Sequence, residues 1–196
     1  SLIVWYSSVS SAVKITGMPD GIFSNINSSG IQTGIDLVNN HLVKAVGFTG
    51  SLNAGRSLLN LANKRDEPIP IFAEMGSVNP VIILPEILQN DCDSIAANYA
   101  KSITLGSGQF CTNPGVIIGL KSDIFTQFVN SLSSSILDIS PSCMLHPNIL
   151  KNFEKNKNKL ISSNSVKVVA DFKSSTKPNY SSQALALVGG LDFINN

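Results

Sequence analysis

The residue best suited to covalent chemistry is Cys111, in the stretch "GQFCTNPG" (residues 108–115). The glycines and the proline around it predict a turn-rich loop that can present the thiol in a cleft. A cysteine reacts as its thiolate, so a nucleophilic role requires a nearby base or a setting that favours the charged form. Taken alone, a single cysteine is more often inert, and Cys92 and Cys143 are expected to be packing or surface residues.

A carboxylate, Glu74, closes an apolar strand in "FAEMGSVNP" (residues 72–80). An unpaired carboxylate is costly to bury, so this side chain is expected either to have a structural partner or to serve as a general base. Gly76 follows closely and would let a ligand approach the backbone.

A third stretch, "FTGSLNAGRS" (residues 48–57), predicts a strand, a Gly-Ser turn and the start of a helix. Backbone N–H groups at such a helix start favour a phosphate, which suggests a dinucleotide pyrophosphate. The spacing also fits G-x-x-x-x-G-K/R-S, although a P-loop requires lysine where this chain has Arg56. An ordinary strand–turn–helix is the third alternative.

The elements that must position these residues alternate along the chain, which predicts an α/β fold with largely parallel sheets. A boundary is expected near residues 73–80, where two strands abut. The expected helices are 1–16, 30–40, 51–65, 93–108, 123–137 and 147–161, and the expected strands are 22–26, 42–50, 69–74, 79–85, 115–120, 165–172 and 183–190.

Composition narrows the class of protein. The 196 residues carry a net charge of +1, which does not fit a nucleic-acid binder. No apolar run approaches the roughly 18 residues of a membrane helix, and three widely spaced cysteines favour a reduced, cytoplasmic protein. The two histidines, His41 and His146, have no metal-ligand spacing and are expected to be surface caps. The chain does not begin with methionine, and we expect it to be an internal piece of a longer protein.

Together the three stretches resemble, in order and spacing, the aldehyde dehydrogenase superfamily. Its members carry a Phe-Thr-Gly-Ser turn, then Glu-Leu-Gly-Gly-Lys-x-Pro, then Gly-Gln-x-Cys. "EPIPIFAEMGSVNPVIILPE" and "GQFCTNPG" are similar to 2,5-dioxopentanoate (alpha-ketoglutaric semialdehyde) dehydrogenases and to NADP-dependent fatty aldehyde dehydrogenases. Where most members have Gly-Gly-Lys, this chain has Gly76, Ser77 and Val78.

The resemblance implies that residues 1–75 are the C-terminal part of a Rossmann-like NAD(P)-binding domain and that residues 76–196 are the N-terminal part of the catalytic domain. Cys111 would attack a small-molecule aldehyde, and Glu74 would activate the water that completes oxidation to the acid. The cofactor would be NAD or NADP. Its binding residues would be Phe48, Gly50, Ser51, Gly55, Met75 and Gly76. A homo-oligomer without nucleic-acid or membrane partners is also implied.

The family's Pro-Trp-Asn-Phe-Pro loop and Glu-x-Phe-Gly-Pro motif do not occur in this sequence. We therefore expect an enzyme fragment, with a catalytically incomplete remnant that binds no cofactor as the alternative. The aldehyde and the choice between NAD and NADP stay open. Truncated sheets would expose strand edges, which predicts poor solubility.

Overall fold

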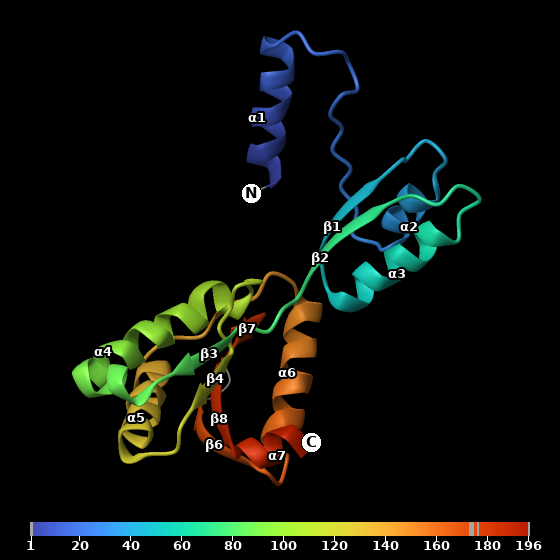
Figure 1. Ribbon diagram of the computed structural model, residues 1–196. Helices are drawn as coiled ribbons and strands as arrows, with labels where there is room; N and C mark the ends of the chain where they lie inside the picture. Colours follow the sequence, from blue (N-terminus) through green and yellow to red (C-terminus); the bar gives the residue numbers. More distant parts are fainter. Residues whose placement is uncertain (1, 173–174, 176, 196) are drawn as a thin grey trace. The chain divides into compact units, whose positions relative to one another are not determined.

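The computed structural model describes residues 2–172, 175 and 177–195, and it divides into two compact units (Figure 1). Unit 1 is Ser1–Met75 and unit 2 is Gly76–Asn196. Each is described by itself. Ser1, the first residue of the expected helix 1–16, and Asn196 lie outside the described residues. The assignment of the two ranges to a cofactor domain and a catalytic domain stays a prediction.

Unit 1 contains a strand–helix–strand motif preceded by two helices. Its elements are α1 (Leu2–Ile15), α2 (Gln32–Asn39), β1 (Val46–Gly50), α3 (Leu52–Asn63) and β2 (Ile71–Met75). β1 and β2 pair in parallel through the crossover α3, and α2 and α3 lie along the same face of the pair (Figure 1). A parallel pair joined by a helix is the βαβ unit of Rossmann-like folds.

A small apolar core holds unit 1 together. Val38 from α2, Ala62 from α3 and Ile69 before β2 are buried against one another. Helix α3 begins where the Ser51 hydroxyl accepts a hydrogen bond from the Ala54 N–H (3.3 Å), which satisfies one of the free donors at the helix start.

Unit 2 begins with a second parallel strand–helix–strand motif. Its elements are β3 (Pro80–Ile83), α4 (Pro85–Thr104), the 3₁₀ turn η1 (Leu105–Gly108), β4 (Val116–Gly119), α5 (Asp123–Leu137), β5 (Ser142–Cys143), α6 (Pro147–Ile161), β6 (Val166–Asp171), β7 (Tyr180–Ser181), β8 (Ala184–Val188) and α7 (Gly190–Asn195). β3 pairs with β4 in parallel, whereas the pairs β5–β7 and β6–β8 are antiparallel.

The core of unit 2 lies where α4 and α5 pack against β3 and β4. Leu88 and Ala96 of α4 and Phe128 and Leu132 of α5 are almost completely buried there. Burial of these apolar side chains is the main force that fixes α4, the helix that leads into the cysteine loop.

The α/β class is confirmed, and three expectations about its elements are corrected. Residues 22–26 are exposed and form no strand in the described chain, because no neighbouring strand is available to pair with them. Helix α4 starts at Pro85, earlier than the expected residue 93, since proline is well tolerated at the first helical position. Its backbone is non-helical at Asp91, whose carboxylate accepts from the Ser94 N–H (3.2 Å), so the expected start lies close to this kink. The C-terminal pair β6–β8 is antiparallel and not parallel.

Candidate functional site

Glu74 and Met75 lie at the carboxyl end of the parallel pair in unit 1. In register, Thr49 stands opposite Glu74 and Gly50 opposite Met75. α3 starts two residues after Gly50, so the helix start and both strand ends share one edge. Ligands of open α/β sheets bind at this edge.

Two glycines at this edge lie in close contact with neighbouring side chains. A Cβ on Gly55 would lie 2.7 Å from the Met75 sulfur, and one on Gly50 would lie 2.5 Å from Cζ of Phe48. The structure therefore brings together four of the six expected cofactor residues in one packed group: Phe48, Gly50, Gly55 and Met75.

The start of α3 can receive an anion. The N–H groups of Leu52 and Asn53 occupy the first helical positions and have no intrahelical acceptor. Ser51 and Leu52 are exposed, so an incoming group can reach these donors. Such donors, together with the helix dipole, favour a phosphate.

Glu74 is exposed at the end of β2. Within the described residues its carboxylate has neither a hydrogen bond nor an ion pair, so the alternative of a structurally paired carboxylate finds no support in unit 1. Gly76 is exposed as well, and a Cβ added there would meet no atom within 4 Å.

Cys111 lies in unit 2, on the loop between η1 and β4. The loop leaves α4 through three residues in left-handed backbone conformation: Gly106 (φ 58°), Ser107 (φ 59°) and Gly108 (φ 73°). Glycine adopts such angles freely, but a serine does so only where its surroundings hold it.

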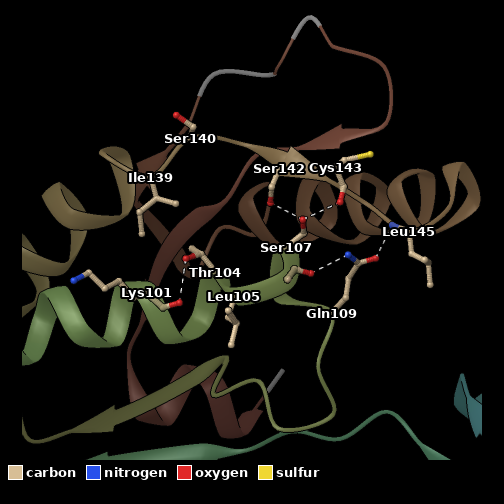
Figure 2. Close-up of a pocket in the computed structure, with 11 residues that line it drawn as sticks. Lys101, Thr104, Leu105, Ser107, Gln109, Ile139, Ser140, Ser142, Cys143 and Leu145 are labelled. Atoms are coloured by element: carbon tan, nitrogen blue, oxygen red, sulfur yellow. Dashed lines mark hydrogen bonds between the residues drawn. The ribbon is translucent and has the colours of Figure 1, made fainter. Parts of the chain in front are cut away.

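The first half of the loop is tied to the segment around β5. The Ser107 hydroxyl shares a hydrogen bond with the Ser142 hydroxyl (2.5 Å) and donates to the Cys143 carbonyl (3.2 Å), which fixes the strained serine (Figure 2). The Gln109 side chain accepts from the Leu145 N–H (3.0 Å). These residues border a shallow cavity of about 610 Å³ that Lys101 and Ile139 also line.

The second half of the loop is tied to the segment before β3 and to α4. The Asn79 amide donates to the carbonyls of Cys111 (2.8 Å) and Asn113 (3.1 Å), and the Ser77 hydroxyl also donates to the Cys111 carbonyl. Asn113 in turn donates to the Ile103 carbonyl (2.7 Å). The Tyr99 hydroxyl donates to the Pro114 carbonyl at the end of the loop.

Cys111 itself is exposed, and among the described residues neither its sulfur nor its N–H has a hydrogen-bond partner. Cys143 is also exposed, whereas Cys92 is buried in the α4–α5 core. Burial, followed by the nearby charges of Asp93 and Asp91, raises the pKa of the Cys92 thiol and makes it less reactive.

The sequence singled out Cys111 but did not predict the contacts of Ser77, Asn79 and Tyr99 with its loop. Serine, asparagine and tyrosine are common residue types, and their identity alone does not indicate which backbone groups they will contact.

In the described part of the chain, no group of three or more histidine, cysteine or carboxylate side chains is arranged to hold a metal ion. None of the described helices combines the length and apolar character that crossing a bilayer requires.

Residues 4–147 match the model of the aldehyde dehydrogenase family, and the chain belongs to this family. Among curated proteins it is 42% identical over 176 residues to the alpha-ketoglutaric semialdehyde dehydrogenase of Acinetobacter baylyi, covering 90% of this chain and 32% of that protein. It is 39% identical over 152 residues to alpha-ketoglutaric semialdehyde dehydrogenase 2 of Azospirillum brasilense, covering 78% of this chain and 29% of that protein. The chain thus spans about a third of the length of these relatives.

Solved structures show the same fold at lower identity. An NAD-dependent benzaldehyde dehydrogenase from Corynebacterium glutamicum superposes with a TM-score of 0.72 at 20% identity, covering 88% of this chain and 38% of that chain. Proline utilization A from Bradyrhizobium japonicum gives a TM-score of 0.76 at 14% identity, covering 92% of this chain and 19% of that chain. The family match leaves the P-loop alternative without support.

Proposed function

We propose that this chain is part of an NAD(P)-dependent aldehyde dehydrogenase that oxidises a semialdehyde to a carboxylic acid, with Cys111 as nucleophile and Glu74 as general base. The observation that carries the proposal is the exposed Cys111 on a loop that hydrogen bonds hold on both sides. The semialdehyde is suggested by the two relatives named for alpha-ketoglutaric semialdehyde.

In this proposal Cys111 attacks the carbonyl carbon of the aldehyde and forms a thiohemiacetal. The Cys111 N–H, which has no acceptor among the described residues, donates to the oxyanion that develops. After oxidation the acyl group is held on sulfur as a thioester. Glu74 takes a proton from water, and the resulting hydroxide attacks the thioester and releases the acid and the thiol.

The cofactor in this proposal is NAD or NADP, which supplies a hydride acceptor when bound. The residues of unit 1 fit a dinucleotide at the carboxyl edge of β1 and β2. The free N–H groups at the start of α3 suit the pyrophosphate, and Gly50 and Gly55 keep the strand–helix junction compact. Met75 and Gly76 would lie beside the nicotinamide.

Ester hydrolysis tests the proposed roles of Cys111 and Glu74, because this reaction needs a nucleophile and a base but no hydride acceptor. The chain is mixed with p-nitrophenyl acetate, and acetylated peptides are mapped by mass spectrometry. We expect acetyl on Cys111, none on buried Cys92, and loss of turnover in Cys111→Ser. Glu74→Gln should accumulate acetyl-Cys111, because the thioester forms but no base activates water. Unchanged turnover in Cys111→Ser would refute the nucleophile, and unchanged deacylation in Glu74→Gln would refute the base.

The remnant alternative is tested with the same protein. Incubation with 2,5-dioxopentanoate and either NAD or NADP should produce the reduced cofactor, which is followed by its absorbance. A chain that acylates at Cys111 but never reduces either cofactor would be a catalytically incomplete remnant. Preference for one cofactor would settle the choice between NAD and NADP.

A further inference from the structure

The carbonyl oxygen of Cys111 accepts hydrogen bonds from two side chains. It accepts from the Asn79 amide at 2.8 Å and from the Ser77 hydroxyl. The Asn79 amide also lies 3.2 Å from the Ser77 oxygen, so the two donors support each other. Both come from the short segment 76–79, which precedes β3 and belongs to no helix or strand.

Holding this carbonyl has a direct effect on the thiol. A residue has two soft backbone torsions, and the position of its carbonyl sets one of them. The other contact of Asn79, to the Asn113 carbonyl at 3.1 Å, fixes the chain two residues further on. The backbone of Cys111 is therefore held from one side, while its sulfur and N–H stay free on an exposed residue.

The segment 76–79 is itself the place where this chain departs from the family pattern, since Ser77 stands where most members have glycine. A glycine has no side-chain donor, so this chain gains a hydrogen bond to the Cys111 carbonyl at that position. Ser77 is exposed and Asn79 half-buried. Neither side chain belongs to the apolar core of unit 2, which makes their contacts with the loop their main interactions.

We propose that Ser77 and Asn79 are positioning residues that hold Cys111 for attack on a carbonyl carbon. The inference rests on the proposed function, because it presupposes that Cys111 is the nucleophile. Attack on a carbonyl requires the sulfur and the Cys111 N–H to face the same substrate, since the N–H must meet the new oxyanion. A backbone free to rotate satisfies both conditions only part of the time.

Two reactions of the same sulfur separate positioning from folding. Acylation by p-nitrophenyl acetate passes through an oxyanion: sulfur bonds to the acetyl carbon, and p-nitrophenolate leaves with the electron pair. Alkylation by iodoacetamide displaces iodide from a saturated carbon and forms no oxyanion. Positioning therefore affects the ratio of the acylation rate to the alkylation rate at Cys111, whereas unfolding or a change in exposure affects both rates.

We expect Ser77→Ala to lower this ratio about fivefold, the value of one net hydrogen bond. Asn79→Asp should lower it about tenfold, because the carboxylate cannot donate and faces two carbonyl oxygens. Ser77→Thr keeps the hydroxyl and should restore the wild-type ratio. Asn90→Asp makes the same chemical change on the exposed surface of α4 and should leave the ratio unaltered.

The outcomes separate the two proposals. If the wild-type chain acylates at Cys111 and the ratio stays the same in Ser77→Ala and Asn79→Asp, the positioning role is wrong and the nucleophile stands. If the wild-type chain does not acylate at Cys111, the proposed nucleophile fails, and the positioning role fails with it. A lowered ratio in both variants, with recovery in Ser77→Thr, establishes the positioning role.

Discussion

Among single residues, Tyr99 ties helix α4 to the end of the cysteine loop. Its hydroxyl donates to the carbonyl of Pro114, and its ring packs edge-on against Phe128, with ring centroids 6.5 Å apart. The side chain is half-buried, and burial raises the pKa of Tyr99 to about 12. The folded state therefore prefers the neutral phenol, which can donate the hydrogen bond.

We predict that Tyr99→Phe lowers the free energy of unfolding by about 1 kcal/mol at neutral pH, because the Pro114 carbonyl loses its donor. The difference should depend on pH. An unfolded tyrosine ionises near pH 10, whereas the folded Tyr99 ionises at about pH 12. The neutral Tyr99 phenol therefore contributes fully to the free energy of unfolding of the wild type below about pH 10. This contribution is lost as the pH rises towards 12.

The measurement is urea unfolding of both proteins over this range of pH. The gap in stability between wild type and Tyr99→Phe should be widest below about pH 10 and should narrow above it. A gap that stays constant up to pH 12 would contradict the role of burial. Ionisation of the phenol, followed by ultraviolet absorbance, gives an independent check, because burial raises the pKa of Tyr99 to about 12.

The site could be predicted from sequence only where the residue type itself carries chemistry. Cys111 and Glu74, whose roles stay predictions, met this condition, since few residue types can serve as a nucleophile or a base. Ser77 and Asn79 did not, because their contacts are hydrogen bonds to a carbonyl 34 and 32 residues away in sequence. Such contacts exist only once β3, α4 and β4 have packed, and no local pattern encodes them.

At the scale of elements, the packing of α3 on β2 depends on one glycine. Gly55 is buried, and an added Cβ would lie 2.7 Å from the Met75 sulfur and 3.5 Å from the Ala73 Cβ. Gly34 in α2 is the control position for the same substitution. It is also helical, but a Cβ there would meet no atom within 4 Å.

We predict opposite effects of the same substitution in these two helices. Gly34→Ala should raise the free energy of unfolding by about 0.5–1 kcal/mol, because alanine is the better helix former and nothing obstructs it. Gly55→Ala should lower it by about 1 kcal/mol, since overpacking against β2 outweighs the gain in helix propensity. Thermal unfolding followed by circular dichroism measures both. Equal stabilisation in the two variants would show that α3 does not pack closely on β2.

The elements differ in how far local sequence determines them. Helices α3, α5 and α6 were predicted closely, because each has a helical pattern of apolar residues and a polar N-cap: Ser51, Ser122 and His146. The two-residue strands β5 and β7 were missed, since they form only by pairing with each other. The antiparallel pairing of β6 with β8 was also missed, because strand direction depends on the path of the intervening chain.

At the scale of the whole molecule, unit 2 exposes an apolar surface that the sequence did not predict. The expected strands 79–85 and 115–120 are rich in apolar residues, yet only one face of the β3–β4 pair is covered, by α4 and α5. On the other face Ile82 and Ile118 stand opposite each other in register and are 69% and 50% exposed. Leu84 and Leu120 continue this apolar face and are also exposed.

Exposed apolar patches with unpaired strand edges favour association between molecules. We predict that the weight-average mass in solution rises above the 20.8 kDa of the single chain as the concentration increases. The double variant Ile82→Lys, Ile118→Lys should stay near the mass of one chain, because two ammonium groups on facing strands repel a second copy.

Sedimentation equilibrium over a range of concentrations measures this association. Leu160→Lys, which adds one lysine at an exposed leucine of α6, away from the β3–β4 pair in sequence, is the control and should associate like wild type. A wild-type chain that stays monomeric at every concentration would show that the apolar face causes no association. Association that persists in the double variant would place the contact elsewhere. Because the substitutions point away from the α4–α5 core, acylation of Cys111 should be retained in the double variant, which separates loss of association from loss of the fold.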